Sequence, residues 1–349
     1  MKAYFQKRIL SFKHPAGTSR GILLSKPSWY VYLYDPNRPY MKGIGECSII
    51  PGLSIDDEEQ IESRLYDICS EINRGTFNFE KPIYEFPALN FAIETALLDY
   101  QVKGTKLLFP SEFTEGTKGI AINALVWMGD MREMYRQVEQ KIEKGFTCVK
   151  LKIGALDLDD ELFLLSNLRK KYSSSDLEIR VDANGSFSYS KVHDVLNKLA
   201  DLNIHSIEQP IFPTQISEMA ELCSTTPIPI ALDEELIGKY PLENKRKLLE
   251  IIKPQYIVLK PSLIGGFKEA TDWINIASEF NIRWWVTSAL ESNIGLNAIA
   301  QWSFDLGSKM PQGLGTGSLF KQNVESPLEV RGQKLFYNPE LNWNFEFVY

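Results

Sequence analysis

Short apolar segments alternate with longer amphipathic segments from about residue 119 onward. Between the first two apolar segments, hydrophobic residues recur at helical spacing over 131–144, and Gly145 suits the end of that helix. Alternating strands and helices indicate parallel βα units, and seven strands in series favour a closed barrel over an open sheet. The seven predicted strands are 121–127, 147–153, 178–182, 204–208, 228–233, 256–260 and 283–288.

The first 110 residues have a different pattern, which is typical of an α+β domain. Residues 28–35 carry aromatic residues and Val at strand-like density, and residues 41–48 follow a turn and are predicted to pair with them as a hairpin. A helix is predicted over 54–75, because acidic residues stand at its start and Gly75 suits its end. A second helix, rich in Ala and Leu, is predicted over 88–101 and is expected to be buried on more than one side.

The alternation of strands and helices stops after residue 318. The tail carries aromatic residues at every second position over 343–349, which predicts a final strand whose aromatic side chains pack in the core or against the cap. We therefore predict a barrel domain over 119–318 and an α+β capping domain over 1–118 that is completed by 319–349. Eight βα units of about 26 residues need roughly 200 residues, which leaves the rest of the chain for the cap.

A polar residue stands at or beside the end of six predicted strands. Each interval between these residues is about one βα unit, so their side chains should meet at one rim of the barrel. The carboxyl ends of the strands form the active site in barrels of this kind. The six residues are Lys152, Asp182, Glu208, Asp233, Lys260 and Ser288.

Three consecutive strands thus direct Asp182, Glu208 and Asp233 to one point. Three carboxylates cannot lie together uncompensated, because like charges raise their pKa values and hold some of them protonated. A hard divalent cation resolves this conflict, and an all-oxygen ligand set suits Mg²⁺ best and Mn²⁺ next. Zinc is not expected, since no His or Cys joins the set.

Lysines flank this predicted metal site. Lys150 and Lys152 alternate with Leu151, so both ammonium groups leave the same face of one strand, while Lys260 arrives from the opposite side of the barrel. A nearby like charge and a divalent cation both favour the uncharged amine that a lysine base needs. A metal and a lysine base suit the removal of a proton α to a carboxylate, because the metal stabilises the enediolate that forms.

Composition narrows the remaining choices. The 349-residue chain has 38 Lys and Arg against 45 Asp and Glu, a net charge of −7, which argues against a nucleic-acid partner. Its four Cys lie far apart without metal-ligand spacing, and we expect free thiols rather than disulfides. No signal peptide and no apolar stretch of membrane-spanning length is evident, so we expect a soluble cytoplasmic protein with no membrane partner.

Several segments resemble the muconate-lactonizing-enzyme subgroup of the enolase superfamily, in order and at βα spacing along the whole chain. The resemblance implies a modified TIM barrel, (β/α)7β, with a capping domain built from both ends of the chain. Within the subgroup, it implies Mg²⁺-dependent syn dehydration of 2-succinyl-6-hydroxy-2,4-cyclohexadiene-1-carboxylate to 2-succinylbenzoate, a step of menaquinone biosynthesis. The segments are GIGECS, VKLKIG, VDANGSF, IEQP, ALDEEL, VLKPSLIGG, SALESNIGL and GLGTGSLF.

The same resemblance implies a role for each site residue. Lys152 would remove the α-proton and return it to the departing hydroxyl, while Lys260 would stay charged and stabilise the enediolate. Lys150 would help to hold the substrate carboxylate, and Asn184 and Glu234 would orient the lysines and metal ligands. Mg²⁺ would be bound by Asp182, Glu208 and Asp233. The remaining substrate contacts would come from the cap segment 49–53 and from Ser19, Arg20, Ser288, Gly315 and Thr316.

Two alternatives stay open at this point. An N-acylamino acid racemase or dipeptide epimerase would keep the site and change the substrate, since two lysines on opposite faces also suit racemization. Dipeptide epimerases carry an Asp-x-Asp pair after the last barrel strands, and residues 305–318 offer only Asp305. The remote alternative is a non-catalytic barrel that binds an anion or a partner. The sequence does not predict the oligomeric state.

Overall fold

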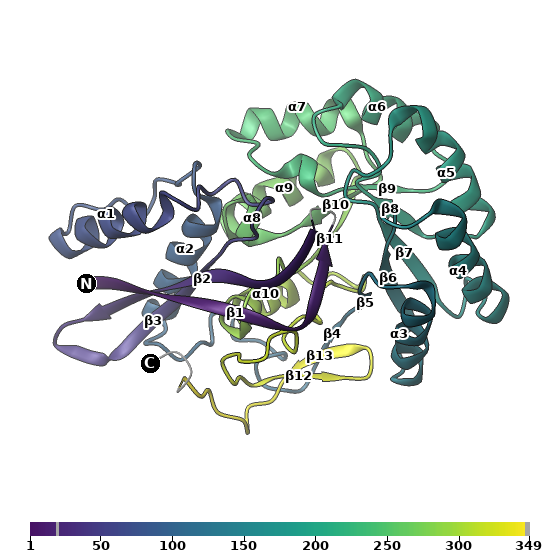
Figure 1. Cartoon of the computed structure of the whole chain (residues 1–349). Coiled ribbons are helices and arrows are strands. Elements are labelled where there is room, and N and C mark those ends of the chain that lie inside the picture. The colour runs from purple at the N-terminus through teal and green to yellow at the C-terminus, as the bar shows by residue number, and fades with distance from the viewer. Residues whose placement is uncertain (19–20, 346–349) are drawn as a thin grey trace.

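The capping sheet lies beside the barrel in the computed structural model, which describes residues 1–18 and 21–345 (Figure 1). It has three antiparallel strands in the order β1 (Lys2–Thr18), β2 (Gly21–Asp35) and β3 (Arg38–Ser48). The predicted hairpin of 28–35 with 41–48 is confirmed by the β2–β3 register. The sequence did not reveal β1, because a register shift between Ser11 and Ala16 interrupts its pattern and most of its described side chains are partly buried or exposed.

Two helices cover this sheet. The first, α1 (Ile61–Arg74), begins later than predicted, because Asp56 turns inward and accepts hydrogen bonds from Ala88 N (3.0 Å) and Leu89 N (3.3 Å) at the start of the second helix. Gly75 ends α1 in the left-handed region at φ 77°, as expected. The second helix, α2 (Pro87–Gln101), is buried along most of its length, which confirms the prediction.

Two glycines of β3 allow α2 to pack closely on the sheet. A Cβ at Gly43 would lie 2.2 Å from Ala96 O, and one at Gly45 would lie 2.0 Å from Ala92 O. Any larger residue would therefore push the helix away from the strand. This close contact explains the GIG part of the segment GIGECS and fixes the strand that carries Glu46.

All seven predicted barrel strands are present and lie parallel in sequence order, β5 to β11. The residues Gln312 and Gly313 close the circle: Gln312 bridges to Ile122 beside β5, and Gly313 bridges to Thr287 after β11. The strands are β5 (Ala124–Val126), β6 (Cys148–Lys152), β7 (Glu178–Asp182), β8 (Ser206–Glu208), β9 (Ile230–Leu232), β10 (Tyr256–Leu259) and β11 (Arg283–Val286). This is the modified TIM barrel that the sequence predicts.

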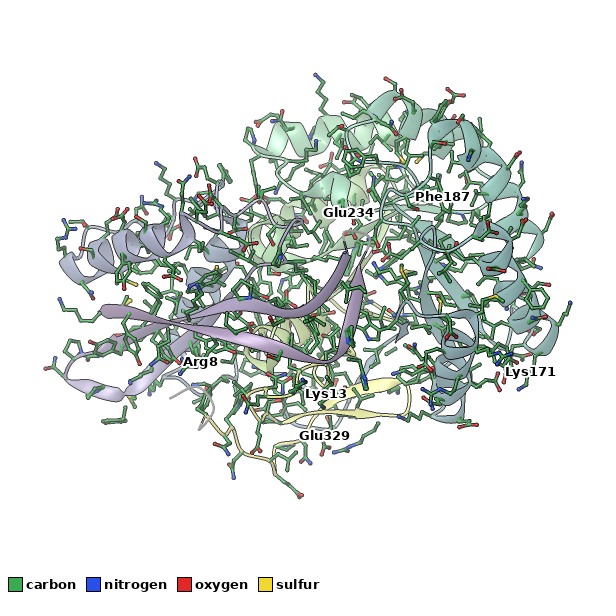
Figure 2. All side chains as sticks on the ribbon, in the orientation of Figure 1. Arg8, Lys13, Lys171, Phe187, Glu234 and Glu329 are labelled. Carbon is green, nitrogen blue, oxygen red and sulfur yellow. The ribbon has the colours of Figure 1, made fainter. Side chains whose placement is uncertain are left out.

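Helices form the outer layer of the barrel (Figure 1). Their apolar side chains pack on apolar side chains of the strands in one buried cluster. Lys171, at the end of α4, lies on the outer surface, whereas Glu234 is buried (Figure 2). The helices of this layer are α3 (Met131–Glu143), α4 (Leu158–Lys171), α5 (Tyr189–Asp201), α6 (Ile216–Thr225), α7 (Leu242–Ile252), α9 (Phe267–Glu279) and α10 (Asn293–Asp305). Two short helices, η1 (Glu234–Leu236) and α8 (Pro261–Ile264), follow β9 and β10.

The tail differs from the prediction. A hairpin, β12 (Leu328–Arg331) and β13 (Lys334–Tyr337), pairs with β4 (Ile120–Ala121) at the start of the barrel, and the sequence analysis did not predict it. The strand predicted over 343–349 is wrong as far as residue 345, where one isolated bridge from Asn344 to Glu325 forms. Residues 346–349 lie outside the described part.

The two aromatic side chains of 343–349 that the structure describes nevertheless pack as expected. Trp343 and Phe345 lie against the buried cluster that contains Tyr30 and Tyr32 of the cap sheet. Partial burial against this cluster, rather than strand pairing, accounts for the spacing of Trp343 and Phe345. The division of the chain into 1–118, 119–318 and 319–349 stays a prediction.

Two further expectations concern the chain as a whole. All four Cys are buried free thiols, as predicted. Among the described residues, none of the helices combines the length and apolar character that crossing a membrane requires.

Candidate active site

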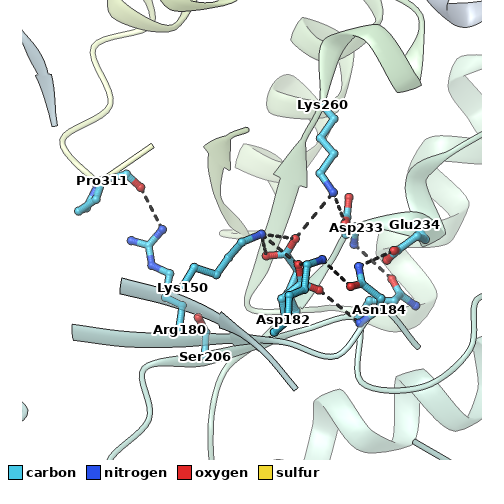
Figure 3. A network of polar contacts seen from close by, with 12 residues as sticks. Lys150, Arg180, Asp182, Asn184, Ser206, Asp233, Glu234, Lys260 and Pro311 are labelled. Carbon is cyan, nitrogen blue, oxygen red and sulfur yellow. Dashed lines mark hydrogen bonds and ion pairs between the residues drawn. The ribbon is translucent and has the colours of Figure 1, made fainter. Parts of the chain in front are cut away.

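The carboxyl ends of the barrel strands bring the predicted catalytic and metal-binding residues together (Figure 3). Lys152, Asp182 and Glu208 are register neighbours on β6, β7 and β8. Asp233 and Lys260 directly follow β9 and β10. We refer to these five residues and Lys150 as the rim.

Each rim carboxylate is paired with a lysine. Lys150 Nζ donates to Asp182 Oδ2 at 3.1 Å and to Glu208 Oε1 and Oε2 at 3.0 and 2.9 Å. Lys260 Nζ donates to Asp233 and lies 3.9 Å from Glu208 Oε1. The two lysines therefore enter the carboxylate cluster from β6 and β10, on opposite sides of it.

Lys152 has its own partners. Its Nζ donates to Asp182 Oδ2 at 2.7 Å and to Asn184 Oδ1 at 2.5 Å. The Asn184 side chain in turn donates to Glu234 Oε1 at 2.8 Å, while the other oxygen of Glu234 is buried and has no hydrogen-bond partner among the described residues. Asn184 has a left-handed backbone at φ 46°, which Asn tolerates better than most residues. The predicted orienting residues thus form a chain behind Lys152.

Burial and the neighbouring carboxylates shift the pKa values of the rim lysines in opposite directions. Burial alone would lower the pKa of Lys150, but Asp182 and Glu208 outweigh it and hold that pKa above its usual range. Burial would likewise lower the pKa of Lys260, but Asp233 and Glu208 outweigh this effect and hold that pKa above its usual range. Burial, and then the Asp182 charge, raise the pKa of Glu208 to about 7. Even with two lysines beside it, the carboxylate cluster therefore carries repulsion that a further cation would relieve.

The donor set of the rim fits a hard divalent cation. Three buried carboxylates follow consecutive strands, and each carries oxygen ligands of the kind that Mg²⁺ prefers. Within residues 1–18 and 21–345, no group of three or more His, Cys, Asp or Glu side chains has the arrangement that could hold a metal ion. Instead, the ammonium groups of Lys150 and Lys260 lie between the carboxylates (Figure 3). Enolase-superfamily sites generally pair a Lys or His base with Mg²⁺.

A pocket opens above the rim. Its lysines are Lys150, Lys152 and Lys260. Much of its wall is apolar, and the cap contributes three residues from the predicted segment 49–53. A hydrocarbon ring with a carboxylate suits a pocket of this character, since apolar walls favour the ring and the lysines favour the acid. The apolar lining includes Ile50, Pro51, Leu53, Leu125, Trp127 and Leu290.

The predicted substrate contacts Ser288, Gly315 and Thr316 also line this pocket. The Ser288 hydroxyl, however, donates its one proton to Glu291 Oε2 at 2.6 Å and accepts from Thr316 Oγ1 at 2.9 Å. It also accepts from Leu290 N at 3.1 Å, so its hydrogen-bonding capacity is filled from within the protein. The other two predicted contacts, Ser19 and Arg20, lie outside the described residues.

Sequence reasoning missed two polar residues of the pocket, Asn123 and Thr287. Thr287 follows β11 two residues after Trp285, whose side chain lies in the barrel interior, so alternation along the strand turns Thr287 inward. The alternation of side chains along the strand could have revealed this from the sequence, because it predicts that the Thr287 hydroxyl, not that of Ser288, faces inward.

Comparison with known proteins agrees with this geometry. The family described as enolase C-terminal domain-like matches residues 133–335. The chain is 46% identical over 363 residues to the o-succinylbenzoate synthase of Desulfotalea psychrophila, a match that covers 95% of this chain and 98% of that protein. The chain belongs to the o-succinylbenzoate synthase family of the enolase superfamily. It is therefore an enzyme.

Solved structures and more distant relatives support this placement. The crystal structure of MenC from Desulfotalea psychrophila superposes with a TM-score of 0.85 at 42% identity, covering 96% of this chain and 99% of that one. The N-succinyl-L-Arg/Lys racemase of Bacillus cereus is 27% identical over 241 residues, which covers 65% of this chain and 63% of that protein. The synthase match is thus both stronger and longer than the racemase match.

Proposed function

We propose that this chain converts 2-succinyl-6-hydroxy-2,4-cyclohexadiene-1-carboxylate to 2-succinylbenzoate in menaquinone biosynthesis, with the rim residues in the following roles. In this lyase reaction the C–H bond α to the ring carboxylate and the C–O bond of the ring hydroxyl break, water leaves and an aromatic ring forms. The observation that carries the proposal is the placement of Lys152 and Lys260 on opposite sides of three buried carboxylates, beneath a largely apolar pocket.

Lys152 is the proposed base. Its Nζ takes the α-proton and then delivers it to the departing hydroxyl on the same face of the ring, so one group serves a syn elimination. Asp182 and Asn184 accept hydrogen bonds from this Nζ and fix its direction. Glu234 holds Asn184 in place through the side-chain amide.

Lys260 is the proposed cation on the other face of the substrate. Asp233 and Glu208 hold its pKa above the usual range against the effect of burial, so it stays charged while negative charge develops on the substrate. An ammonium group fixed before the reaction stabilises an enediolate without reorganising in the transition state. Lys150, with its pKa also raised, would help to hold the ring carboxylate.

Asp182, Glu208 and Asp233 would hold Mg²⁺, with Mn²⁺ as a substitute. When bound there, the metal supplies Lewis-acid stabilisation of the carboxylate oxygens of the substrate. The hydrophobic wall keeps water away from these charges, which strengthens each electrostatic interaction in the pocket. Thr316 and Gly315 line the same pocket and would contact the part of the substrate that lies away from the metal.

Racemization of an N-acylamino acid is a second candidate function. It is favoured by the same pair of opposed lysines, since a racemase removes a proton on one face and returns it on the other. A dipeptide epimerase is less well supported, because residues 305–318 contain only one acidic residue, Asp305.

Turnover of the cyclohexadiene substrate with Mg²⁺ tests the proposal. We expect the wild type to form 2-succinylbenzoate, and we expect Lys152→Ala and Lys260→Ala each to lose about a thousandfold in kcat. Lys247→Ala, an exposed residue of α7, is the matched control and should retain full activity. No turnover by the wild type, or full activity in both rim variants, would contradict the proposal. Exchange of the α-proton of N-succinyl amino acids in D₂O, without dehydration, would favour the racemase instead.

A further inference from the structure

A buried neutral residue, Gln209, directly follows Glu208 in the segment IEQP. Gln209 is 0% exposed, and its backbone is left-handed at φ 41°. Glycine adopts this conformation freely, whereas a residue with a Cβ adopts it at a cost. A glutamine at such a position points to a contact that its side chain makes and glycine could not.

The backbone of Gln209 joins the ends of the two strands on either side of β8. Its N–H donates to Ala231 O on β9 at 2.8 Å, and its carbonyl accepts from Gly185 N at 2.6 Å in the turn that follows β7. Gln209 is therefore fixed by the same three strands that carry the predicted metal ligands.

The side chain of Gln209 reaches the start of the short helix η1. Its Oε1 accepts from Asp233 N and from Glu235 N, each at 3.2 Å, and its Nε2 donates to Ile211 O at 3.1 Å. Backbone N–H groups in the first turn of a helix have no partner within that helix. The amide oxygen of Gln209 supplies one from a neighbouring strand.

Asp233 occupies the position from which an aspartate ordinarily caps its own helix. It is the N-cap residue of η1, yet its side chain makes no capping hydrogen bond to that helix, which lies wholly in the described part of the chain. An N-cap Asp usually accepts from the N–H two or three residues later, and the N–H of Glu235 is already bound by Gln209. The Asp233 carboxylate instead accepts from Lys260 Nζ at the rim (Figure 3).

We propose that Gln209 is a positioning residue, which caps η1 in place of Asp233 and so leaves the Asp233 carboxylate free to bind Mg²⁺ at the rim. The inference rests on the proposed function, which assigns the metal to Asp182, Glu208 and Asp233. Without the amide oxygen of Gln209, the Asp233 carboxylate turns toward the N–H of Glu235 and away from the rim. Gln209 thus acts on the metal through the direction of Asp233.

Calorimetric titration of Mg²⁺ into the metal-free chain tests this role. Gln209→Met keeps an unbranched side chain and removes the acceptor, and we expect it to weaken Mg²⁺ binding about tenfold. The matched control is Gln301→Met on α10. Gln301 is also buried, accepts from Phe109 N at 3.1 Å and donates to Lys106 O at 2.7 Å, where α10 meets the cap. Its replacement should leave the Mg²⁺ affinity unchanged.

A second variant keeps the test decisive if Gln209→Met does not fold. Gln209→Gly also lacks the acceptor, and glycine adopts the left-handed backbone freely, which offsets part of the lost packing. We expect it to fold and to weaken Mg²⁺ binding about tenfold as well. Thermal unfolding of each variant shows that it is folded at the temperature of the titration.

Turnover gives a second signature of a positioning role. In Gln209→Met the Mg²⁺ concentration for half-maximal rate should rise about tenfold, while kcat at saturating Mg²⁺ should change less than about threefold. A residue that only stabilises the fold would lower the melting temperature and leave this Mg²⁺ requirement unchanged. A fall in kcat without a change in the Mg²⁺ requirement would overturn the proposed role.

The remaining outcomes separate this inference from the proposed function. Wild-type Mg²⁺ affinity in folded Gln209→Met or Gln209→Gly, or equal weakening by Gln301→Met, would overturn the role of Gln209 alone. A wild type that binds no Mg²⁺ would contradict the metal assignment of the proposed function, and the inference with it.

Discussion

Buried and partly buried carboxylates occur in two regions of this molecule, and their partners differ in kind. At the rim, Asp182, Glu208 and Asp233 are paired with lysine side chains. At the contact between cap and barrel, which we call the seam, Glu46 of β3 and Glu94 of α2 are bound mainly by backbone N–H groups and hydroxyls. Both regions shield acidic side chains from water, but only the rim offers flexible side chains as their partners.

The two acids of the seam accept hydrogen bonds from backbone N–H groups at the starts of two barrel helices. Glu46 accepts from Ser292 N at 2.9 Å, from Ser292 Oγ at 2.6 Å and from Gly295 N at 3.0 Å at the start of α10. Glu94 accepts from Phe267 N at 2.6 Å and Lys268 N at 3.1 Å at the start of α9. Helix N-termini stabilise negative charge with donors that are otherwise unpaired. Each carboxylate therefore fixes the cap to the barrel.

The difference between rim and seam partners indicates which acidic residues serve activity and which serve stability. Backbone donors at the seam cannot leave without unwinding a helix, so the seam is suited to hold two domains together. The lysines at the rim have flexible side chains, and an incoming cation or carboxylate can replace one of their contacts. We therefore expect substitutions at the rim to affect activity and substitutions at the seam to affect the free energy of unfolding.

Glu208→Gln should give the largest effect and the sharpest separation. We expect a loss of about a thousandfold in kcat, because the amide cannot supply the charge of a metal ligand. The free energy of unfolding should change by less than about 1 kcal/mol, since the amide oxygen still accepts from Lys150 and the repulsion with Asp182 disappears. Turnover and urea unfolding measure the two quantities, and a large loss of stability with retained activity would break the comparison.

Glu46→Ala should show the opposite behaviour. It leaves Ser28, Ser292 and the N–H of Gly295 without their buried acceptor, so we expect a loss of about 3 kcal/mol in the free energy of unfolding. Urea unfolding measures this, with Glu58→Ala as the exposed acidic control that should change stability by less than about 0.5 kcal/mol. An unfolding curve unchanged by Glu46→Ala would remove the structural role assigned to the seam.

Glu94 should contribute a dependence of stability on pH. Burial raises its pKa to about 7, although two backbone N–H groups act in the opposite direction. The folded state therefore favours the protonated acid, and this contribution to stability is present at low pH and declines as the pH rises from about 4.5 to about 7.

Glu94→Gln should lack this decline. The difference in unfolding free energy between variant and wild type should therefore change by about 3 kcal/mol between about pH 4.5 and about pH 7 and stay constant outside that range. Asp56, whose burial also raises its pKa to about 7, should keep its own share in both proteins. Unfolding free energies at closely spaced pH values measure the effect, and parallel curves for the two proteins would contradict it.

The strand pattern was enough to predict the barrel and the residues at its rim. Each of these apolar segments has a polar residue at its carboxyl end, which placed Lys152, Asp182 and Glu208 at neighbouring positions. The register of the strands confirms that placement. The pattern works there because parallel strands of similar length must end at the same edge. The roles assigned to these residues stay predictions.

The seam and the inward-facing hydroxyl could not be predicted in the same way. Glu46 and Ser292 are 246 residues apart, and no local pattern indicates that they meet. To choose Thr287 instead of Ser288, the end of the predicted strand must be known to within one residue. An apolar pattern does not define strand ends that finely. Tertiary contacts settle both matters.

The difference between rim and seam is tested most directly by calorimetric titration of Mg²⁺ into the metal-free chain and two variants. The account predicts one binding site in the wild type, affinity at least about tenfold weaker in Asp182→Asn, and unchanged affinity in folded Glu94→Gln. No Mg²⁺ binding by the wild type, or equal weakening by the rim and seam variants, would contradict it.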